Sequence, residues 1–475
     1  MNYKNKIITK KKDNFSQWYT DICKKAELMD YSCVKGFIIY HEYGYAIWEE
    51  IKKYLDKKLK ENDHKNVYMP LVIPETLFNK EKDHVNGFKP ETLIATIGGE
   101  EKLQEKLIIR PTSEAIFADF YSRIINSYRD LPKLYNQWCS VVRWEKTTRP
   151  FIRGNEFLWQ EGHTIHKNSK EAMDETLKIL KIYNNMGKDI LAIPFISGEK
   201  SNKEKFAGAE KTFTIETLVD NSRSLQCGTS HYFGQNFTKV FNVKFLDKDN
   251  KIKIPYQTSW GISTRLIGAI IMIHGDDNGL VLPPFIAPIQ VIIIPIQNKN
   301  HKVKKKVNNC LNKLIKSNIK AKIDNSDHTP GWKFSEWEMK GVPIRIEIGL
   351  NDIEKKQITL VKRNDGSKFI IKQQNIEKEV VKFLNKINDE MYQNAQKKIN
   401  QHICKAENIN EIIKIINNGN CAKTFWCENE SCENKIKELT TATLRCILPE
   451  KNNHVGTCPI CKKEAKKIVL FAKSY

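Results

Sequence analysis

The sequence has no long run of apolar residues. Its longest apolar runs, such as Val291–Ile296, have the length of one strand, which excludes a membrane-spanning helix. The basic N-terminus is not followed by an apolar stretch, so a secretory signal peptide is not expected. A Walker A or dinucleotide-binding glycine pattern is also absent, so a bound nucleotide would need a different platform. We therefore expect a protein that works away from membranes.

Arginine is scarce as well. The chain has 78 lysines and arginines together, yet only eleven of them are arginine. Three of the eleven lie in one short window, between residues 138 and 164: Arg143, Arg149 and Arg153. The planar arginine fork binds phosphate or carboxylate oxygens through two bonds, whereas lysine offers a mobile point charge. The cluster predicts a polyphosphate or carboxylate site built from separate parts of the chain.

Length and composition set further bounds. A chain of 475 residues is expected to hold roughly two to four domains. The net charge of +22 indicates a polyanionic partner, but an AT-rich genome would also enrich lysine, so both interpretations stay open. Twelve mostly scattered cysteines in so large a chain favour a reducing compartment, and the expected location is the cytoplasm.

The apolar periodicities predict three parts. Residues 1–284 alternate helical and strand-like segments, 285–395 read as an α/β unit, and 396–475 form a small cysteine-containing part. The α/β unit begins with a buried β-branched strand and contains a hairpin that turns at Asn364-Asp365-Gly366. Other expected elements are a helix over 43–60, strands over 67–73, 140–142 and 157–161, and helices over 263–273 and 375–417.

The segment Arg110-Pro-Thr-Ser-Glu114 follows an apolar strand and ends in a hydroxyl and a carboxylate. On an extended loop, Thr112 and Glu114 would point to the same side and could bind a substrate amine. The same spacing fits a helix N-cap at Thr112 or Ser113. Taken alone, the spacing favours the cap.

The arginine window indicates two strands joined by a long charged loop. Such a pair of strands could carry a triphosphate, with Arg143 and Arg153 at different phosphates and Phe157 stacked on a purine. A surface hairpin with solvated cations is the alternative. Farther along, Arg265 stands in the first turn of an expected helix, where a cation opposes the helix dipole, so a bound anion explains it better than helix stability.

Two remaining segments carry candidate groups. His231 closes the polar turn 226–231, and taken alone it is more typical of a structural than of a catalytic histidine. The last part of the chain has two cysteine pairs, Cys427-x4-Cys432 and Cys458-x2-Cys461, whose spacing suits tetrahedral Zn²⁺. Four free thiols or two disulfides are the alternatives to this expected structural zinc site.

Together these motifs resemble prolyl-tRNA synthetases of the archaeal/eukaryotic type, a family of class II aminoacyl-tRNA synthetases. The resemblance covers residues 14–475. It rests on RPTSE, VVRWE…RGNEFLWQEGHT, QCGTSHYFGQNF and SWGISTRLIGAIIMIHGDDNGLVLPP in that order, and on GWKFSEWEMKGVPIRIEIG and the cysteine tail. It implies an α+β catalytic domain (1–284) with an antiparallel sheet and flanking helices, an α/β anticodon-binding domain (285–395) and a small α+β zinc-binding domain (396–475).

The resemblance also implies a role for each matching residue. Arg143 would hold the ATP α-phosphate and the activated carboxylate, and Arg265 would hold the far phosphates. Thr112 and Glu114 would bind the prolyl ammonium, so the resemblance favours the loop over the cap. The other proline contacts would be Trp159, Glu161, His163, Phe206 and His231. The other ATP contacts would be Glu145, Arg153, Phe157, Gln226, Thr229 and Ser263. Glu338 and Arg345 would read anticodon bases, and the carboxylate of Tyr475 would reach back towards the active site.

The implied reaction joins L-proline to tRNA(Pro) through a prolyl-adenylate, in a homodimer that uses ATP with Mg²⁺ and carries Zn²⁺. The sequence does not assign the Mg²⁺ ligands.

Two residues depart from the family pattern. Asn155 stands where the family often has a cation, and Cys227 stands where it usually has a glycine; both could weaken substrate binding. About a hundred residues separate the motifs of Arg143 and Arg265, which leaves no room for an editing insertion, so misactivation of alanine and cysteine is expected. The alternatives are a class II synthetase for another small amino acid, or a non-catalytic RNA-binding paralogue.

Overall fold

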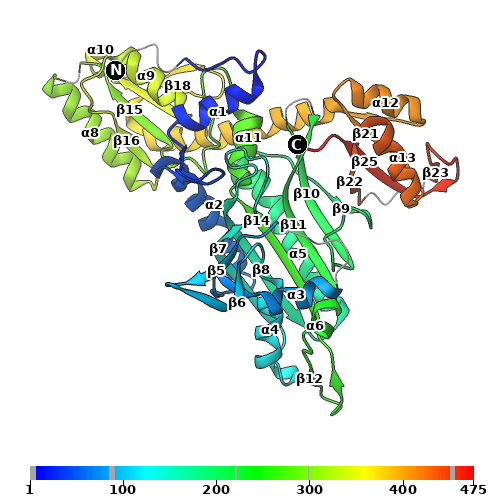
Figure 1. The fold of residues 1–475 in the computed structure, drawn as a ribbon. Coiled ribbons are helices and arrows are strands. Elements are labelled where there is room, and N and C mark those ends of the chain that lie inside the picture. The colour runs from blue at the N-terminus through cyan, green and yellow to red at the C-terminus, as the bar shows by residue number, and fades with distance from the viewer. Residues whose placement is uncertain (1–6, 85–90, 220–221, 298, 450–454) are drawn as a thin grey trace.

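The computed structural model describes residues 7–84, 91–219, 222–297, 299–449 and 455–475. Its centre is an 11-stranded sheet in the order β20-β21-β25-β22-β9-β10-β11-β14-β8-β7-β3 (Figure 1). The first part of the chain supplies α1 (Phe15–Lys25), β1 (Met29–Tyr31), β2 (Ile38–Tyr40), α2 (Glu42–Lys60), β3 (Lys65–Asn66), β4 (Val72–Pro74), α3 (Glu75–His84), β5 (Ile94–Gly98), β6 (Glu101–Ile109), α4 (Glu114–Ile124), β7 (Lys133–Val142), β8 (Glu156–His166), α5 (Ser169–Met186), β9 (Ile196–Glu199), β10 (Lys211–Leu218), β11 (Ser224–Gly234), α6 (Asn236–Val240), β12 (Phe245–Leu246), β13 (Ile252–Lys253), β14 (Tyr256–Ser263) and α7 (Arg265–His274).

The strands from β9 to β8 pair antiparallel, and their register brings distant motifs together. Trp159 of β8 pairs with Ser263 of β14, and Gly261 of β14 pairs with both Glu161 of β8 and Thr229 of β11. Because side chains alternate between the two faces of a strand, this register places every second residue of three strands on one face. The apolar sides of α1, α2, α5 and α7 pack with residues of the central strands into the largest apolar core of the described residues.

The α/β unit has the expected elements. Its five strands lie in the order β16-β15-β17-β18-β19, with the first three parallel and the last two antiparallel. Strand β15 is buried throughout, as its β-branched residues predicted, and the expected hairpin is β18–β19. The elements are β15 (Val291–Pro295), α8 (His301–Lys316), β16 (Ala321–Ile323), α9 (Pro330–Met339), β17 (Ile344–Ile348), α10 (Leu350–Glu354), β18 (Gln357–Lys362), β19 (Lys368–Lys372) and α11 (Ile376–His402).

Helix α11 runs from the α/β unit to the C-terminal part of the chain (Figure 1). The expected boundary at residue 395 lies inside this continuous helix of 27 residues. The elements after it are β20 (Ile403–Lys405), α12 (Ile409–Asn417), β21 (Cys421–Trp426), α13 (Glu430–Thr440), β22 (Thr443–Ile447), β23 (Gly456–Thr457), β24 (Glu464–Ala465) and β25 (Lys467–Ala472). Four of these strands extend the central sheet, because Ile447 of β22 pairs with Glu199 of β9.

A buried ionic cluster strengthens this joint. The Glu216 carboxylate of β10 accepts hydrogen bonds from Lys200 Nζ at 2.5 Å, from Arg445 Nε at 2.9 Å and from Ser224 Oγ at 2.5 Å. Arg445 belongs to β22, whereas Lys200, Glu216 and Ser224 belong to the first part of the chain, residues 1–284. Burial raises the pKa of a carboxyl, but Lys200 and Arg445 outweigh it and lower the pKa of Glu216. Glu216 is therefore fully engaged by neighbouring side chains.

Two expected elements are wrong in part. The strand over 67–73 is replaced by the short strands β3 and β4, because the backbone between them bonds to side chains: Met69 N donates to Gln137 Oε1, and Met69 O accepts from Arg110. The helix over 375–417 ends at His402, and α12 begins anew after Asn408, whose side chain caps it. Within the described ranges, no helix is both long enough and apolar enough to cross a bilayer.

Candidate active site and metal centre

A cavity of about 260 Å³ opens above β8, β11 and β14. Twelve of the residues singled out in the sequence line it: Thr112, Glu114, Arg143, Phe157, Trp159, Glu161, Phe206, Gln226, Thr229, His231, Ser263 and Arg265. A second cavity of about 50 Å³ shares Arg143, Phe157, Ser263 and Arg265 with the first, and it is also lined by Glu145 and Arg153. The two cavities form one continuous candidate site with arginines at the boundary between them.

The first residue of α4, Glu114, presents its carboxylate to the larger cavity beside Thr112 of the preceding loop. Thr112 Oγ1 donates to Glu114 Oε2, and Ser259 Oγ of β14 donates to Glu114 Oε1 at 2.8 Å. Ser113 stands at the N-cap position, but its side chain makes no cap hydrogen bond. The N-cap interpretation is therefore right in position, whereas the expected capping bond of the side chain is not made. The buried Glu114 carboxylate is suited to a cationic amine, as a charge-assisted acceptor.

A second carboxylate, Glu161, is fixed from behind by neighbouring side chains. It accepts hydrogen bonds from Ser113 Oγ at 2.5 Å and Gln137 Nε2 at 2.7 Å, and His163 Nε2 lies 3.1 Å away. Burial raises the pKa of a carboxyl, but His163, Ser113 and Gln137 outweigh it and lower the pKa of Glu161 to about 2. His163 was expected at the pocket edge. Instead it is fully buried behind Glu161 and stacks on Phe117.

His231 forms an uncharged wall of the cavity. Its Nδ1 lies 3.0 Å from Thr212 Oγ1, and its ring lies 4.8 Å from the ring of Phe206. Burial, followed by the charges of His163 and Arg143, lowers the pKa of His231 to about 3. At neutral pH the cavity therefore combines the uncharged rings of His231 and Phe206 with the carboxylates of Glu114 and Glu161.

The two arginines at the cavity boundary are held by backbone carbonyl groups. Arg143 Nε donates to Pro111 O at 3.0 Å, while Arg265 donates to Ile152 O and Gln226 O, both at 3.1 Å. Neither guanidinium forms a salt bridge within the described part of the chain. The pKa of Arg265 is lowered mainly by burial and further by the nearby cations Arg143 and Arg153. Converging cations with spare donors are suited to a polyanion.

The chain is similar to known synthetases along nearly its whole length. Residues 96–274 match the tRNA synthetase class II core domain (G, H, P, S and T), 290–383 match the anticodon binding domain, and 409–475 match the prolyl-tRNA synthetase C-terminal domain. The proline–tRNA ligase of Clostridium botulinum (strain Loch Maree / Type A3) is 51% identical over 98% of both chains, and proline–tRNA ligase 2 of a Bacillus cereus strain is equally similar. The chain belongs to the prolyl-tRNA synthetase family.

Solved structures of this family agree with the fold. The prolyl-tRNA synthetase of Cryptosporidium parvum, crystallised with halofuginone and AMPPNP, superposes with a TM-score of 0.95 at 39% identity. That match covers 99% of this chain and 97% of the other. A second structure of the Cryptosporidium enzyme, with L-proline and AMP, gives a TM-score of 0.94. The family therefore accounts for the three matched parts of the chain and for their order.

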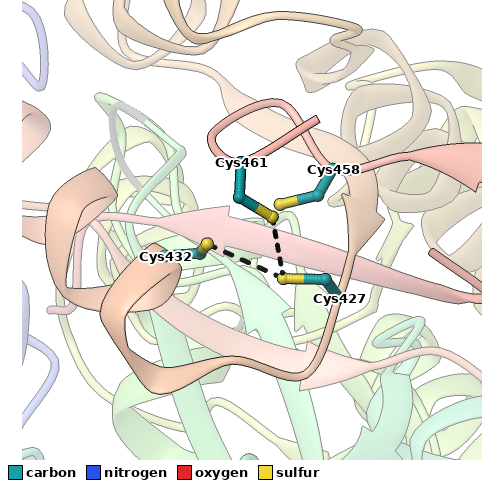
Figure 2. A group of neighbouring side chains, drawn as sticks. All are labelled: Cys427, Cys432, Cys458 and Cys461. Carbon is teal, nitrogen blue, oxygen red and sulfur yellow. Dashed lines mark hydrogen bonds between the residues drawn. The ribbon is translucent and has the colours of Figure 1, made fainter. Parts of the chain in front are cut away.

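Four cysteines of the C-terminal part converge as the spacing predicted (Figure 2). Cys427 follows β21, Cys432 lies in the first turn of α13, and the other two, Cys458 and Cys461, lie in the loop between β23 and β24. The four Sγ atoms lie within 4.8 Å of one another, and two pairs are 3.6 and 3.5 Å apart. Tetrahedral Zn²⁺ with Zn–S bonds of about 2.3 Å requires S···S distances of roughly 3.8 Å, so the four thiols fit a zinc ion.

The two candidate anticodon residues lie on neighbouring elements of the α/β unit. Glu338 is in α9, and Arg345 is in β17. Arg345 Nε donates to Glu347 Oε1 at 2.9 Å, and its guanidinium lies 4.0 Å from the ring centroid of Phe334 in α9. Both residues are half-buried, so part of each side chain stays accessible.

Several residues that shape the site were missed by sequence reasoning. Gln137 and Ser259 orient the two carboxylates and were not singled out in the sequence, and Ser113, expected only as a helix cap, bonds to Glu161 instead. Asn155, treated as a departure, closes the charged loop: its Oδ1 accepts from Glu145 N and its Nδ2 donates to Lys35 O. Arg110, by contrast, lies in neither cavity and donates to backbone carbonyl groups.

The chain end lies beside the smaller cavity. Tyr475 N donates to Ser224 O at 3.1 Å, and the guanidinium of Arg149 lies 5.4 Å from the Tyr475 ring centroid. Arg149 also lines the smaller cavity. The last residue is thus close to the site, as the resemblance implied.

The low pKa of His231 makes the stability of the protein depend on pH. Between pH 3 and 6.5 the unfolded chain binds a proton that the folded chain does not, so stability rises with pH by up to about 1.4 kcal/mol per unit and is complete above 6.5. Lowering the pH from 7 to 5 should therefore reduce the melting temperature of His231→Asn less than that of the unaltered protein. Melting temperatures at the two pH values measure this difference. Exposed His301→Asn is the control, and equal losses for all three proteins would contradict the assignment.

Proposed function

We propose that this chain ligates L-proline to tRNA(Pro) with ATP, in two steps through a prolyl-adenylate, as an enzyme of the archaeal/eukaryotic type. The observation that carries the proposal is the joined pair of cavities, which has carboxylates at one end and paired arginines at their boundary. The near full-length likeness to proline–tRNA ligases supports the choice of amino acid.

In the first step, an oxygen of the proline carboxylate attacks the α-phosphorus of ATP, and pyrophosphate leaves with the electrons of the broken P–O bond. Glu114 and Thr112 would hold the prolyl ammonium, and Trp159, Phe206 and His231 would surround the ring. Glu161, kept ionised by its low pKa, would supply a fixed negative edge. No side-chain nucleophile is required, since positioning of the two reactants supplies much of the rate.

The arginines would stabilise the charge that develops on the phosphates. Arg143 would contact the α-phosphate and the attacking carboxylate, and Arg265 and Arg153 would contact the β- and γ-phosphates. The adenine-side contacts would be Glu145, Phe157, Gln226, Thr229 and Ser263. Mg²⁺ would enter with ATP, and the carboxylate of Glu156 in the smaller cavity offers the oxygen atoms that it prefers. Glu216 is excluded from this role by its engagement with Lys200 and Arg445.

In the second step, a terminal ribose hydroxyl of the tRNA attacks the carbonyl carbon of the adenylate, and AMP leaves. The anticodon would be read by Glu338 and Arg345, whose carboxylate and guanidinium are suited to the exposed edges of unstacked bases. The carboxylate of Tyr475 would approach the active site beside Arg149. The excess positive charge would then bind the phosphates of tRNA, and the enzyme would act in the cytoplasm.

ATP–pyrophosphate exchange with each of the twenty amino acids tests this function. We expect strong exchange with proline and weak exchange with alanine and cysteine, because a small pocket discriminates only modestly between such side chains. Arg265→Ala should lower proline exchange by about 100- to 1,000-fold, as expected when a donor to developing charge is lost. Arg223→Ala, an exposed arginine outside both cavities, is the control. Strong exchange with another amino acid would overturn the pocket assignment, and none in folded protein would point to a non-catalytic paralogue.

We further propose that the four-cysteine cluster binds a structural Zn²⁺, supported by its S···S distances. Elemental analysis of the purified protein should then give one zinc per chain, and Cys461→Ser should lower both the zinc content and the thermal stability. Cys33→Ser, at an exposed cysteine far along the sequence from the cluster, is the matched control. Metal-free protein that melts at the same temperature as the loaded protein would count against a structural zinc.

We also propose a homodimer. Around β4, β5 and β6, four large apolar side chains are exposed: Tyr68 by 68%, Leu71 by 43%, Ile94 by 40% and Ile97 by 62%. Exposed large apolar side chains that gather around one small sheet are typical of a subunit interface. Light scattering should therefore give twice the chain mass of 55.3 kDa. Ile97→Lys should shift the protein towards monomer, whereas Ile370→Lys, similarly exposed in the α/β unit, should not. A monomer before any substitution would refute the dimer.

A further inference from the structure

The C-terminal end of α9 is bonded to the catalytic part of the chain. Helix ends leave carbonyl groups that have no partner within the helix. Three donors from the catalytic part bond to three successive carbonyl groups here: Leu280 N to Met339 O at 3.0 Å, Tyr43 Oη to Lys340 O at 3.1 Å, and Leu282 N to Gly341 O at 3.1 Å. The end of the helix that carries Glu338 is therefore capped by residues from outside the α/β unit.

An arginine fork completes this junction. Arg363, just after β18, donates through both terminal nitrogens to the Asp276 carboxylate at 2.7 Å and through Nε to Glu338 O at 2.8 Å. Arg363 is almost fully buried, and Asp276 belongs to the loop after α7. Gly279 of the same loop comes so close to α9 that an added Cβ would lie 2.7 Å from Met339 Cα. Close approach and the bidentate bond together fix the position of α9 on this loop.

Helix α7 connects this junction to the active site. Arg265 is its first residue, and Asp276 follows its last residue, His274, by two positions. The ten residues of α7 span roughly 15 Å, and seven of them are buried, so the helix is held rigidly in the core. The residue proposed to hold the ATP phosphates and the residue that holds α9 thus lie at the two ends of one packed element.

We infer that Asp276 and Arg363 are positioning residues for the tRNA step: they fix the anticodon-reading helix α9 to the end of the helix that begins at Arg265. The inference rests on the proposed function, since it takes Glu338 as a residue that reads the anticodon. Rigid packed elements are the physical carriers of coupling between distant sites. Through this junction, correct seating of the anticodon would favour the arrangement of α7 that transfers proline to the tRNA.

The fork shape of arginine is what the junction requires. Three bonds in one plane join the Arg363 guanidinium to two different parts of the chain. A lysine would keep the charge but could not make the three bonds at once. A second ion pair offers a matched control: Lys320 Nζ and Glu50 Oε2, 3.2 Å apart, also join the α/β unit to α2 of the catalytic part but do not touch α9.

The experiment compares Asp276→Asn, Arg363→Lys and the control Glu50→Gln in the full-length enzyme. Proline-dependent ATP–pyrophosphate exchange tests the proposed function separately, and we expect it to stay unchanged within about twofold, since the cavities keep all their groups. Aminoacylation is then measured with the tRNA(Pro) transcript and with a transcript that has one anticodon base altered. We expect kcat/KM for the tRNA(Pro) transcript to fall roughly 2- to 30-fold in the two junction variants and to stay unchanged in the control.

The decisive quantity is the penalty for the altered anticodon, which is the ratio of kcat/KM for the two transcripts. In both junction variants this penalty should shrink, because the position of α9 is no longer coupled to the catalytic part. Glu50→Gln should keep the full penalty. A penalty as large as that of the unaltered enzyme would mean that the junction only supports the fold, and it would overturn the inference. A parallel fall of exchange and aminoacylation would overturn it too, because the junction would then serve the adenylate step. Melting temperatures show whether either variant has lost the fold. The same change of the penalty in Asp276→Asn and Arg363→Lys would show that it comes from the lost junction and not from one particular substitution.

Discussion

The joint between the two halves of the long sheet depends on the burial of one carboxylate between two cations. Glu216 is 1% exposed, and such a group is costly unless its geometry is nearly ideal. Lys200 and Arg445 provide that geometry from the two sides of the joint. The backbone joins the two parts through the pair Ile447 with Glu199 and through the chain end, where Ser224 N donates to Lys473 O, and the ionic cluster adds buried side-chain bonds across the same joint. Ser224, which also bonds to Glu216, begins β11 and pairs with the chain end, so the same cluster fixes the edge of the active site.

In the active site, too, buried carboxylates need neighbouring side chains to stabilise them, and here hydroxyl and amide groups do so in place of cations. Glu114 begins α4 and Glu161 lies in β8, both are buried, and each is stabilised by hydroxyl or amide donors from a neighbouring strand or loop. Hydrogen bonds to a buried anion are stronger than those between neutral groups and fix its direction. The proposed substrate contacts are therefore prepared before any substrate arrives. The price of this preparation is a set of short polar residues, such as Ser113, within segments that otherwise favour apolar side chains.

The sequence pattern correctly predicted those helices, strands and turns that interactions between neighbouring residues determine. The helix over 43–60, the strands on either side of the arginine loop and the hairpin at 364–366 follow from apolar period and turn chemistry, and they are confirmed. The strand over 67–73 is wrong because its backbone groups bond to Arg110 and Gln137, which lie far away in the sequence. Such partners are invisible to a window of neighbouring residues. For the same reason the spacing around Thr112 favoured a cap, and only the resemblance to a family favoured the loop.

The scarcity of arginine carried real information, but the structure changes its meaning. The sequence suggested that arginine is kept where an anion must be bound. Arg143 and Arg265 do lie at the cavity boundary with donors to spare. Arg110, Arg363 and Arg445, however, use the same planar fork inside the protein, on backbone carbonyl groups and on buried or half-buried carboxylates. Where an arginine is buried or half-buried, this chain therefore uses it for a fixed geometry of several donors, which lysine cannot supply. A sequence shows where that geometry is required, and only the fold shows whether its acceptor is a substrate or the protein itself.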